Sequence, residues 1–133
     1  MHDFILKEIK NTNIENELDL IGFDSSYMKK ASEKFVYKNI KIFNLTVAQA
    51  NILKQTAISV GADCATHKET INANMLKTDC ILGGSISQLN KISKKLSHQP
   101  FGLKELGKLL KQEISCYKLA KIVGILNLTK DSF

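Results

Sequence analysis

The end of the chain carries the side chains best suited to a polar reaction site. The stretch Asn127-Leu128-Thr129-Lys130-Asp131-Ser132-Phe133 follows the apolar run Ile122-Val123-Gly124-Ile125-Leu126. A continuous apolar run is typical of a parallel strand covered on both faces. Barrel enzymes assemble their sites just beyond the carboxyl ends of such strands. The amide, hydroxyl and carboxyl groups here therefore predict a strand followed by the beginning of an active-site loop.

Two other groups of residues invite a chemical interpretation. Gly83-Gly84-Ser85 lies between a predicted strand and a predicted helix, where free N–H groups and the helix dipole favour an anion. The sequence matches neither G-x-G-x-x-G nor a P-loop, so a tight turn is favoured. Cys64, His67 and Cys80 are conceivable metal ligands or a Cys/His nucleophile pair, but their spacing fits no such site. Buried thiols and a surface histidine are favoured instead.

Three motifs of the form S/T-x-x-E/Q predict helix starts at Thr12, Thr46 and Ser85. The apolar stripes that follow them are Ile14, Leu18 and Ile21; Ala50, Leu53, Ala57 and Val60; and Ile86, Leu89, Ile92 and Leu96. Gly22 and Gly61 are suitable helix stops. Two further helices are predicted, one starting near Asp24 or Ser25 and one with Leu103, Leu106, Leu110 and Ile114 on its inner side.

Short apolar or alternating segments predict the strands. They are Phe4 to Leu6, the residues around Ile40 and Ile42, Asp63 to His67, and Cys80 to Leu82. Strands and helices alternate, which predicts an α/β (or α+β) fold with a mixed sheet and helices packed on it.

The composition restricts the class of protein. With 133 residues, 44% of them hydrophobic, the chain can bury the core of one domain. It has no apolar run long enough for a membrane span and no signal-peptide pattern, so we expect a cytoplasmic protein without a membrane partner. The chain has three cysteines, Cys64, Cys80 and Cys116, and no C-x-x-C motif. We expect all three to be small buried thiols. The net charge of +6 comes from lysines without any arginine, so we expect solvated lysines and no nucleic-acid partner.

The last thirteen residues, Lys121 to Phe133, closely resemble the first signature of dihydropteroate synthases, G-I-(L/V)-N-V-T-P-D-S-F at the end of the first barrel strand. Val123 stands where methionine is common, and Lys130 stands where proline is usual, so φ is not fixed there as in the family. A looser resemblance, to the extension that some bacterial members carry, covers Leu45 to Gln112. It rests on three segments: Ala50 to Gln55, Thr78 to Gly84, and Gln99 to Leu103.

The resemblance implies a division of the chain and a chemistry. Residues 1–117 would form an N-terminal α/β extension, and residues 118–133 the first strand and loop of an incomplete TIM barrel. The family condenses p-aminobenzoate with 6-hydroxymethyl-7,8-dihydropterin pyrophosphate and uses Mg²⁺. By the match, Asn127 would contact the magnesium and the pyrophosphate. Thr129, Asp131, Ser132 and Phe133 would belong to the mobile loop that closes over the substrates.

A barrel needs about 250 residues, so we expect this chain alone to be inactive. In the intact enzyme, the N-terminal extension would contact the catalytic barrel of the same chain, and two copies of the enzyme would form a homodimer. Two alternatives stay open. The first is a non-catalytic interaction or regulatory module, which a large exposed apolar patch would favour. The second is a small basic nucleic-acid binder, which strongly salt-dependent binding to DNA or RNA would favour.

Overall fold

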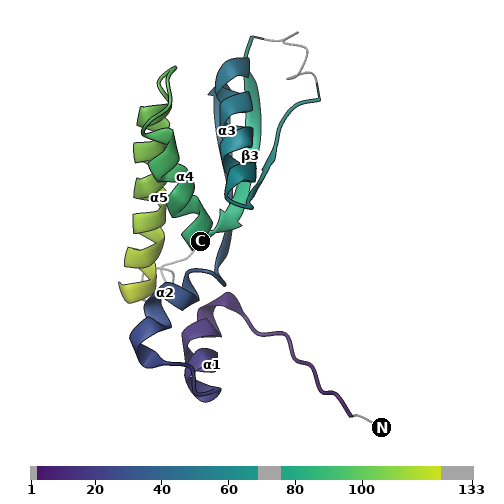
Figure 1. The fold of residues 1–133 in the computed structure, drawn as a ribbon, viewed down its shortest axis with the longest axis vertical. Coiled ribbons are helices and arrows are strands. Elements are labelled where there is room, and N and C mark those ends of the chain that lie inside the picture. The colour runs from purple at the N-terminus through teal and green to yellow at the C-terminus, as the bar shows by residue number, and fades with distance from the viewer. Residues whose placement is uncertain (1–2, 69–75, 124–133) are drawn as a thin grey trace, which may run out of the picture.

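The computed structural model describes residues 3–68 and 76–123 (Figure 1). The N-terminal part consists of short helices that follow an extended arm. A 3₁₀ turn, η1 (Asn11–Asn13), leads into α1 (Ile14–Leu20), and a second turn, η2 (Ser25–Tyr27), leads into α2 (Met28–Ser32). Gly22 ends the α1 segment with φ +84, the left-handed conformation that a helix stop favours.

The rest of the described chain is a three-stranded sheet with helices. The strands are β1 (Tyr37–Leu45), β2 (Asp63–Ala65) and β3 (Thr78–Ser85), in the order β1-β3-β2. β3 is antiparallel to both neighbours. The prediction of a mixed sheet is therefore wrong in this respect. β1 and β2 do run in the same direction, but β3 lies between them, so these two strands are not hydrogen-bonded to each other.

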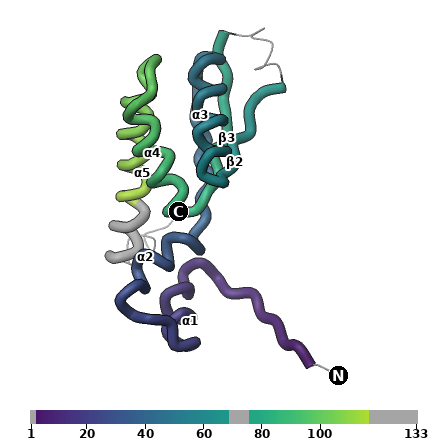
Figure 2. Tube along the Cα trace, in the orientation of Figure 1, coloured from purple at the N-terminus to yellow at the C-terminus, as the bar shows by residue number. Residues whose placement is uncertain are grey.

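Three longer helices complete the fold: α3 (Val47–Ser59), α4 (Ile86–Leu96) and α5 (Leu103–Val123). α3 packs on the sheet, α4 contacts both α3 and β3, and α5 lies against α4 (Figure 2). The expected α/β class is confirmed at this level. None of the helices in residues 3–68 and 76–123 combines the length and apolarity needed to cross a membrane.

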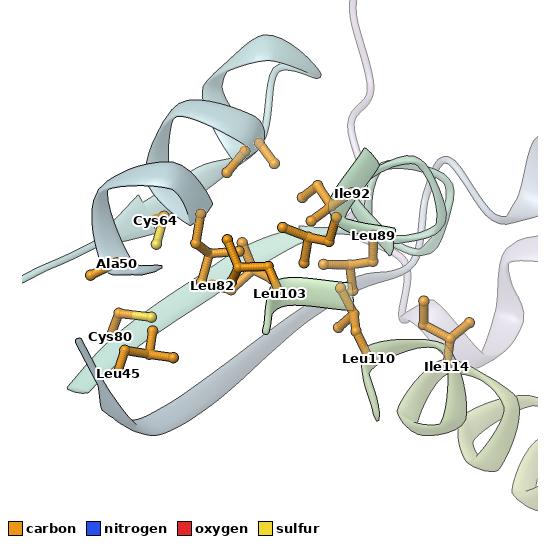
Figure 3. Close-up of a cluster of buried hydrophobic side chains, with 14 of the residues drawn as sticks. Leu45, Ala50, Cys64, Cys80, Leu82, Leu89, Ile92, Leu103, Leu110 and Ile114 are labelled. Atoms are coloured by element: carbon orange, nitrogen blue, oxygen red, sulfur yellow. The ribbon is translucent and has the colours of Figure 1, made fainter. Parts of the chain in front are cut away.

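The hydrophobic core lies between the sheet and these helices (Figure 3). The predicted stripe of α4 is confirmed, because Ile86, Leu89, Ile92 and Leu96 are all buried. The core also contains Ala50, Leu53 and Ala57 from α3, Cys64 from β2, Cys80 and Leu82 from β3, and Leu103, Leu110 and Ile114 from α5. Sequence periodicity thus identified the inner side of every long helix.

The N-terminal predictions fared less well. Phe4 to Leu6 is not a strand; these residues belong to an arm outside the sheet (Figure 1), and Ile5 is 95% exposed. Thr12 does not cap a helix, because it lies inside η1 and α1 begins at Ile14 without a side-chain cap. Ile14 and Leu18 are buried as expected, but Ile21 is exposed. A short segment with little to pack against cannot enforce its local preferences.

The C-terminal end of α5 also differs from expectation. The helix continues through Val123, so Ile122 and Val123 are helical where the sequence predicts the start of a strand. A helix satisfies its own backbone hydrogen bonds, whereas a parallel strand needs neighbouring strands. The rest of that run, residues 124–126, lies outside the described residues, and the proposed boundary between residues 117 and 118 falls within α5.

Candidate functional site

The residues predicted for the substrate loop and metal contact are Asn127, Thr129, Asp131, Ser132 and Phe133, and all of them lie outside the described residues. Their roles stay predictions. The structure does describe the other residue groups that the sequence singled out. It also shows an exposed face of the sheet that the sequence analysis did not identify.

Gly83-Gly84-Ser85 is neither an anion cradle nor a tight turn. Both glycines belong to β3, which runs into α4 without a loop. The first amide groups of α4 already have partners: Ser85 N–H donates to Gln88 Oε1 at 2.9 Å, and Gln88 N–H donates to Ser85 Oγ at 3.1 Å. Carbonyl oxygens of the segment before β1 accept from the next two amides, Val36 O from Ile86 N–H and Glu33 O from Ser87 N–H. Because these amide hydrogens are already donated, few N–H groups at the start of α4 are left to bind an anion.

Gly83 leaves room for two side chains of β1. A Cβ atom built on it would lie 2.7 Å from both Asn39 Oδ1 and Tyr37 Oη. The two side chains therefore lie across the β3 backbone on the side of the sheet away from the core. A larger residue at this position would displace them.

Cys64 and Cys80 are buried neighbours on adjacent strands, whereas Cys116 is exposed, so the expectation of buried thiols is wrong for Cys116. A hydrogen bond to Cys64, together with burial, raises the pKa of the Cys80 thiol, which favours its neutral form. A neutral buried thiol is a poor nucleophile and a poor metal ligand.

His67 is exposed and does not join the two thiols. It lines a polar pocket of about 450 Å³ at the end of the sheet with Asn44, Lys77, Thr78 and Asp79. Among residues 3–68 and 76–123, no three His, Cys, Asp or Glu side chains come together as a metal site would require.

Among residues 3–68 and 76–123, no helix packs on the side of the sheet that faces away from the core. Large side chains on this face are substantially exposed: Tyr37 (48%) and Phe43 (61%) on β1, and Ile81 (47%) on β3. Lys41 lies between the two aromatic residues along β1, and its Nζ is 5.1 Å from the centre of the Phe43 ring. We call Tyr37, Asn39, Lys41, Phe43 and Ile81 the open sheet face.

Sequence reasoning missed this face, although a signal was present. β1 carries isoleucines on its inner side, Ile40 and Ile42, and aromatic residues on its outer side, Tyr37 and Phe43. A strand with large apolar residues on both sides is typical of a sheet whose second side also makes contacts.

Within the part of the chain that the structure describes, these features define a small α/β domain with helices on one face of its sheet. In comparisons with curated proteins, the chain is 37% identical over 131 residues to the bifunctional dihydropteroate synthase/dihydropteroate reductase of Helicobacter pylori, which is 97% of this chain and 34% of the relative. It is 26% identical over 112 residues to the probable bifunctional folylpolyglutamate synthase/dihydropteroate synthase of Halobacterium salinarum, which is 75% of this chain and 14% of the relative.

The resemblance to dihydropteroate synthases is therefore confirmed by curated homologues with that name. The chain spans about a third of the length of the Helicobacter relative and less of the other. No family model and no solved structure matches the chain.

Proposed function

We propose that this chain is part of a dihydropteroate synthase, in which an α/β domain precedes the first strand and loop of a catalytic barrel. The observation that carries the proposal is the 37% identity over 97% of the chain to the Helicobacter pylori protein. Dihydropteroate synthase is also the activity that the names of both relatives share. The complete protein would act in the cytoplasm, as a homodimer, on p-aminobenzoate and 6-hydroxymethyl-7,8-dihydropterin pyrophosphate.

The polar residues at the end of the chain would contribute to this chemistry. The Asn127 side chain offers an amide oxygen, a ligand type that a hard cation such as Mg²⁺ accepts. Bound magnesium would offset the negative charge that develops on the departing pyrophosphate. Thr129, Asp131 and Ser132 would order the loop around the pyrophosphate, and the Phe133 ring would exclude water from p-aminobenzoate.

The test is an assay of the complete protein for dihydropteroate formation. Asn127→Ala should lower kcat/KM by at least about tenfold, because it removes a contact to the charged leaving group. Lys130→Pro, which restores the usual residue of the family, is the matched control in the same loop and should retain activity. Equal activity of the Asn127→Ala variant and the unchanged protein would contradict the assigned role. The 133-residue chain alone should show no turnover.

The open sheet face supports a second, compatible role as a docking domain. Apolar side chains gathered on one exposed sheet face are typical of a contact surface. Because the chain spans only 34% of the Helicobacter relative, we propose that the occupant is the remaining part of the same polypeptide. The domain would then position or stabilise the barrel without taking part in the reaction.

Hydrogen–deuterium exchange can test this docking. Amides of β1 should exchange more slowly in the complete protein than in the 133-residue chain, because a docked partner covers them. The double variant Tyr37→Ser, Phe43→Ser should remove the difference. Leu109→Ser is the control, since Leu109 is 52% exposed but lies on α5, away from the sheet. Identical exchange of β1 in the complete protein and the chain would refute docking at this face.

The name of the Helicobacter pylori relative also includes a dihydropteroate reductase activity, and 97% of the present chain aligns with that protein. A reductase function for residues 1–117 is therefore a third candidate, and an alternative to docking. Deleting these residues from the complete protein separates the two proposals. Loss of reduction with retention of synthesis would assign the reductase to the extension, whereas loss of neither would leave docking as its role.

A further inference from the structure

α4 and α5 approach closely at Gly107. A Cβ atom built on Gly107 would lie 2.9 Å from the backbone oxygen of Ser93, so the approach depends on glycine. Ser93 Oγ also donates a hydrogen bond of 2.8 Å to the Gly107 carbonyl. A groove of about 450 Å³ runs along this contact. Its polar lining is mainly cationic and includes Lys94, Lys104, Lys108, Lys111 and Gln112.

The lysines of the groove line the same pocket. Lys104, Lys108 and Lys111 follow each other at helical spacing on one side of α5, over about 10 Å of the helix. Within the described residues, no carboxylate forms an ion pair with them or with Lys94. Lys111 Nζ instead donates to Asn90 Oδ1 at 3.2 Å.

This arrangement is unfavourable without a counter-charge. Like charges three and four residues apart repel on a helix, and Lys104 lies in the first turn of α5, where the helix dipole disfavours a cation. Glu105, in the same turn, offsets only part of this charge, because three lysines of α5 and Lys94 line the groove. A groove also concentrates the potential of the charges that line it. Binding of an anion would relieve both costs.

We infer that this groove binds a small ligand that carries an oligophosphate group. Lysine ammonium groups are effective phosphate ligands as point charges, and four of them suit several adjacent negative charges. The hydroxyl hydrogens of Ser93 and Ser97 are already donated to backbone carbonyls, so the ammonium groups supply most of the recognition. The inference does not depend on the synthase proposal.

Isothermal titration calorimetry of the 133-residue chain with inorganic tripolyphosphate, at low ionic strength, tests the site. The triple variant Lys104→Gln, Lys108→Gln, Lys111→Gln should bind at least about tenfold more weakly. The matched control is Lys29→Gln, Lys30→Gln, Lys34→Gln, which removes the same charge from exposed positions in and just after α2. The control should bind almost as well as the unchanged chain, and added salt should weaken binding.

Three results would overturn the inference. The first is that the chain does not bind tripolyphosphate. The second is that both triple variants bind tripolyphosphate equally weakly. The third is that the chain binds a single-stranded oligonucleotide more tightly than tripolyphosphate, and that both triple variants lose this oligonucleotide binding equally. The last result would indicate a diffuse nucleic-acid surface instead. Circular dichroism checks that the groove variant folds. If it does not, the single variants Lys108→Gln and Lys30→Gln, both at exposed positions, repeat the comparison. Weaker tripolyphosphate binding is again expected only for Lys108→Gln.

Discussion

The same sequence motif has different outcomes in two regions of the molecule. Thr46 and Ser85 each begin a helix with a complete capping box. In each box, the hydroxyl oxygen accepts from the backbone amide three residues later, and the side chain of that later residue accepts from the backbone amide of Thr46 or Ser85. Thr12, in the N-terminal region, has the motif but lies inside a 3₁₀ turn. The difference shows that a capping motif sets a helix start only where packing holds the helix.

The third residue after the cap explains part of the contrast. In the two formed boxes it is glutamine, which accepts a bond at the helix start and also donates one to a distant segment. Gln49 Nε2 donates to Phe101 O at 2.7 Å, and Gln88 Nε2 donates to Val60 O at 3.4 Å. The N-terminal motif has Glu15, whose carboxylate oxygens lack the N–H donors of a glutamine. Ser32 Oγ lies 3.3 Å from Glu15 Oε2 but is nearer to the Lys29 carbonyl oxygen, at 2.8 Å.

The largest difference between the regions should appear on truncating a buried leucine. Leu89→Ala should lower the free energy of unfolding by about 3 kcal/mol, because Leu89 is fully buried and its loss leaves a cavity. Leu20→Ala, at a residue 69% exposed, should change it by less than about 0.5 kcal/mol. Urea denaturation measures both, and similar losses would mean that the N-terminal helices share the main core.

The next largest effect concerns the caps. Ser85→Ala should cost about 1 kcal/mol, because the Gln88 amide loses its acceptor at the start of α4. Thr12→Ala should cost less than about 0.5 kcal/mol, since Thr12 caps no helix. Thermal unfolding followed by circular dichroism compares the two. A cost at Thr12 as large as at Ser85 would refute the structural difference between the motifs.

A conservative change should sharpen the contrast between glutamine and glutamate. Gln49→Glu keeps the acceptor for the Thr46 amide but loses the donor to Phe101 O, so we expect a loss of about 1 kcal/mol, reduced by the favourable helix dipole. Glu15→Gln should have a smaller effect, because the Ser32 hydroxyl keeps its shorter hydrogen bond, 2.8 Å, to the Lys29 carbonyl oxygen. Urea midpoints at neutral pH check both, and an unchanged midpoint for Gln49→Glu would contradict the role given to its donor.

The smallest expected effect is a pH dependence in the N-terminal region. The Ser26 backbone amide, and then the Ser26 hydroxyl, lower the pKa of Asp24 by hydrogen bonding to its carboxylate. A folded-state pKa below the unfolded value stabilises the turn above about pH 4, and this contribution is lost as the pH falls through the folded pKa. The Ser26 amide resonance should report the transition, and Asp24→Ala should abolish it.

Much of the helical structure followed from local rules, for specific reasons. The boxes at Thr46 and Ser85 and the stripe of α4 combine a start signal with a buried side, so local preference and packing agree. The errors fell where they disagree. Phe4 to Leu6 has the composition of a strand but lies outside the sheet, and Gly83-Gly84 resembles a turn but belongs to β3, where it pairs with β1.

The sequence by itself determined the chain's relationship to dihydropteroate synthases and the inner sides of its long helices, because both depend on residue order along the chain. Only the tertiary structure decided which strands are neighbours, since pairing joins residues such as Tyr37 and Ser85 that are far apart in sequence. It also decided which surfaces stay uncovered. The open sheet face and the lysine groove exist because separate elements meet there, and no local pattern specifies which elements meet.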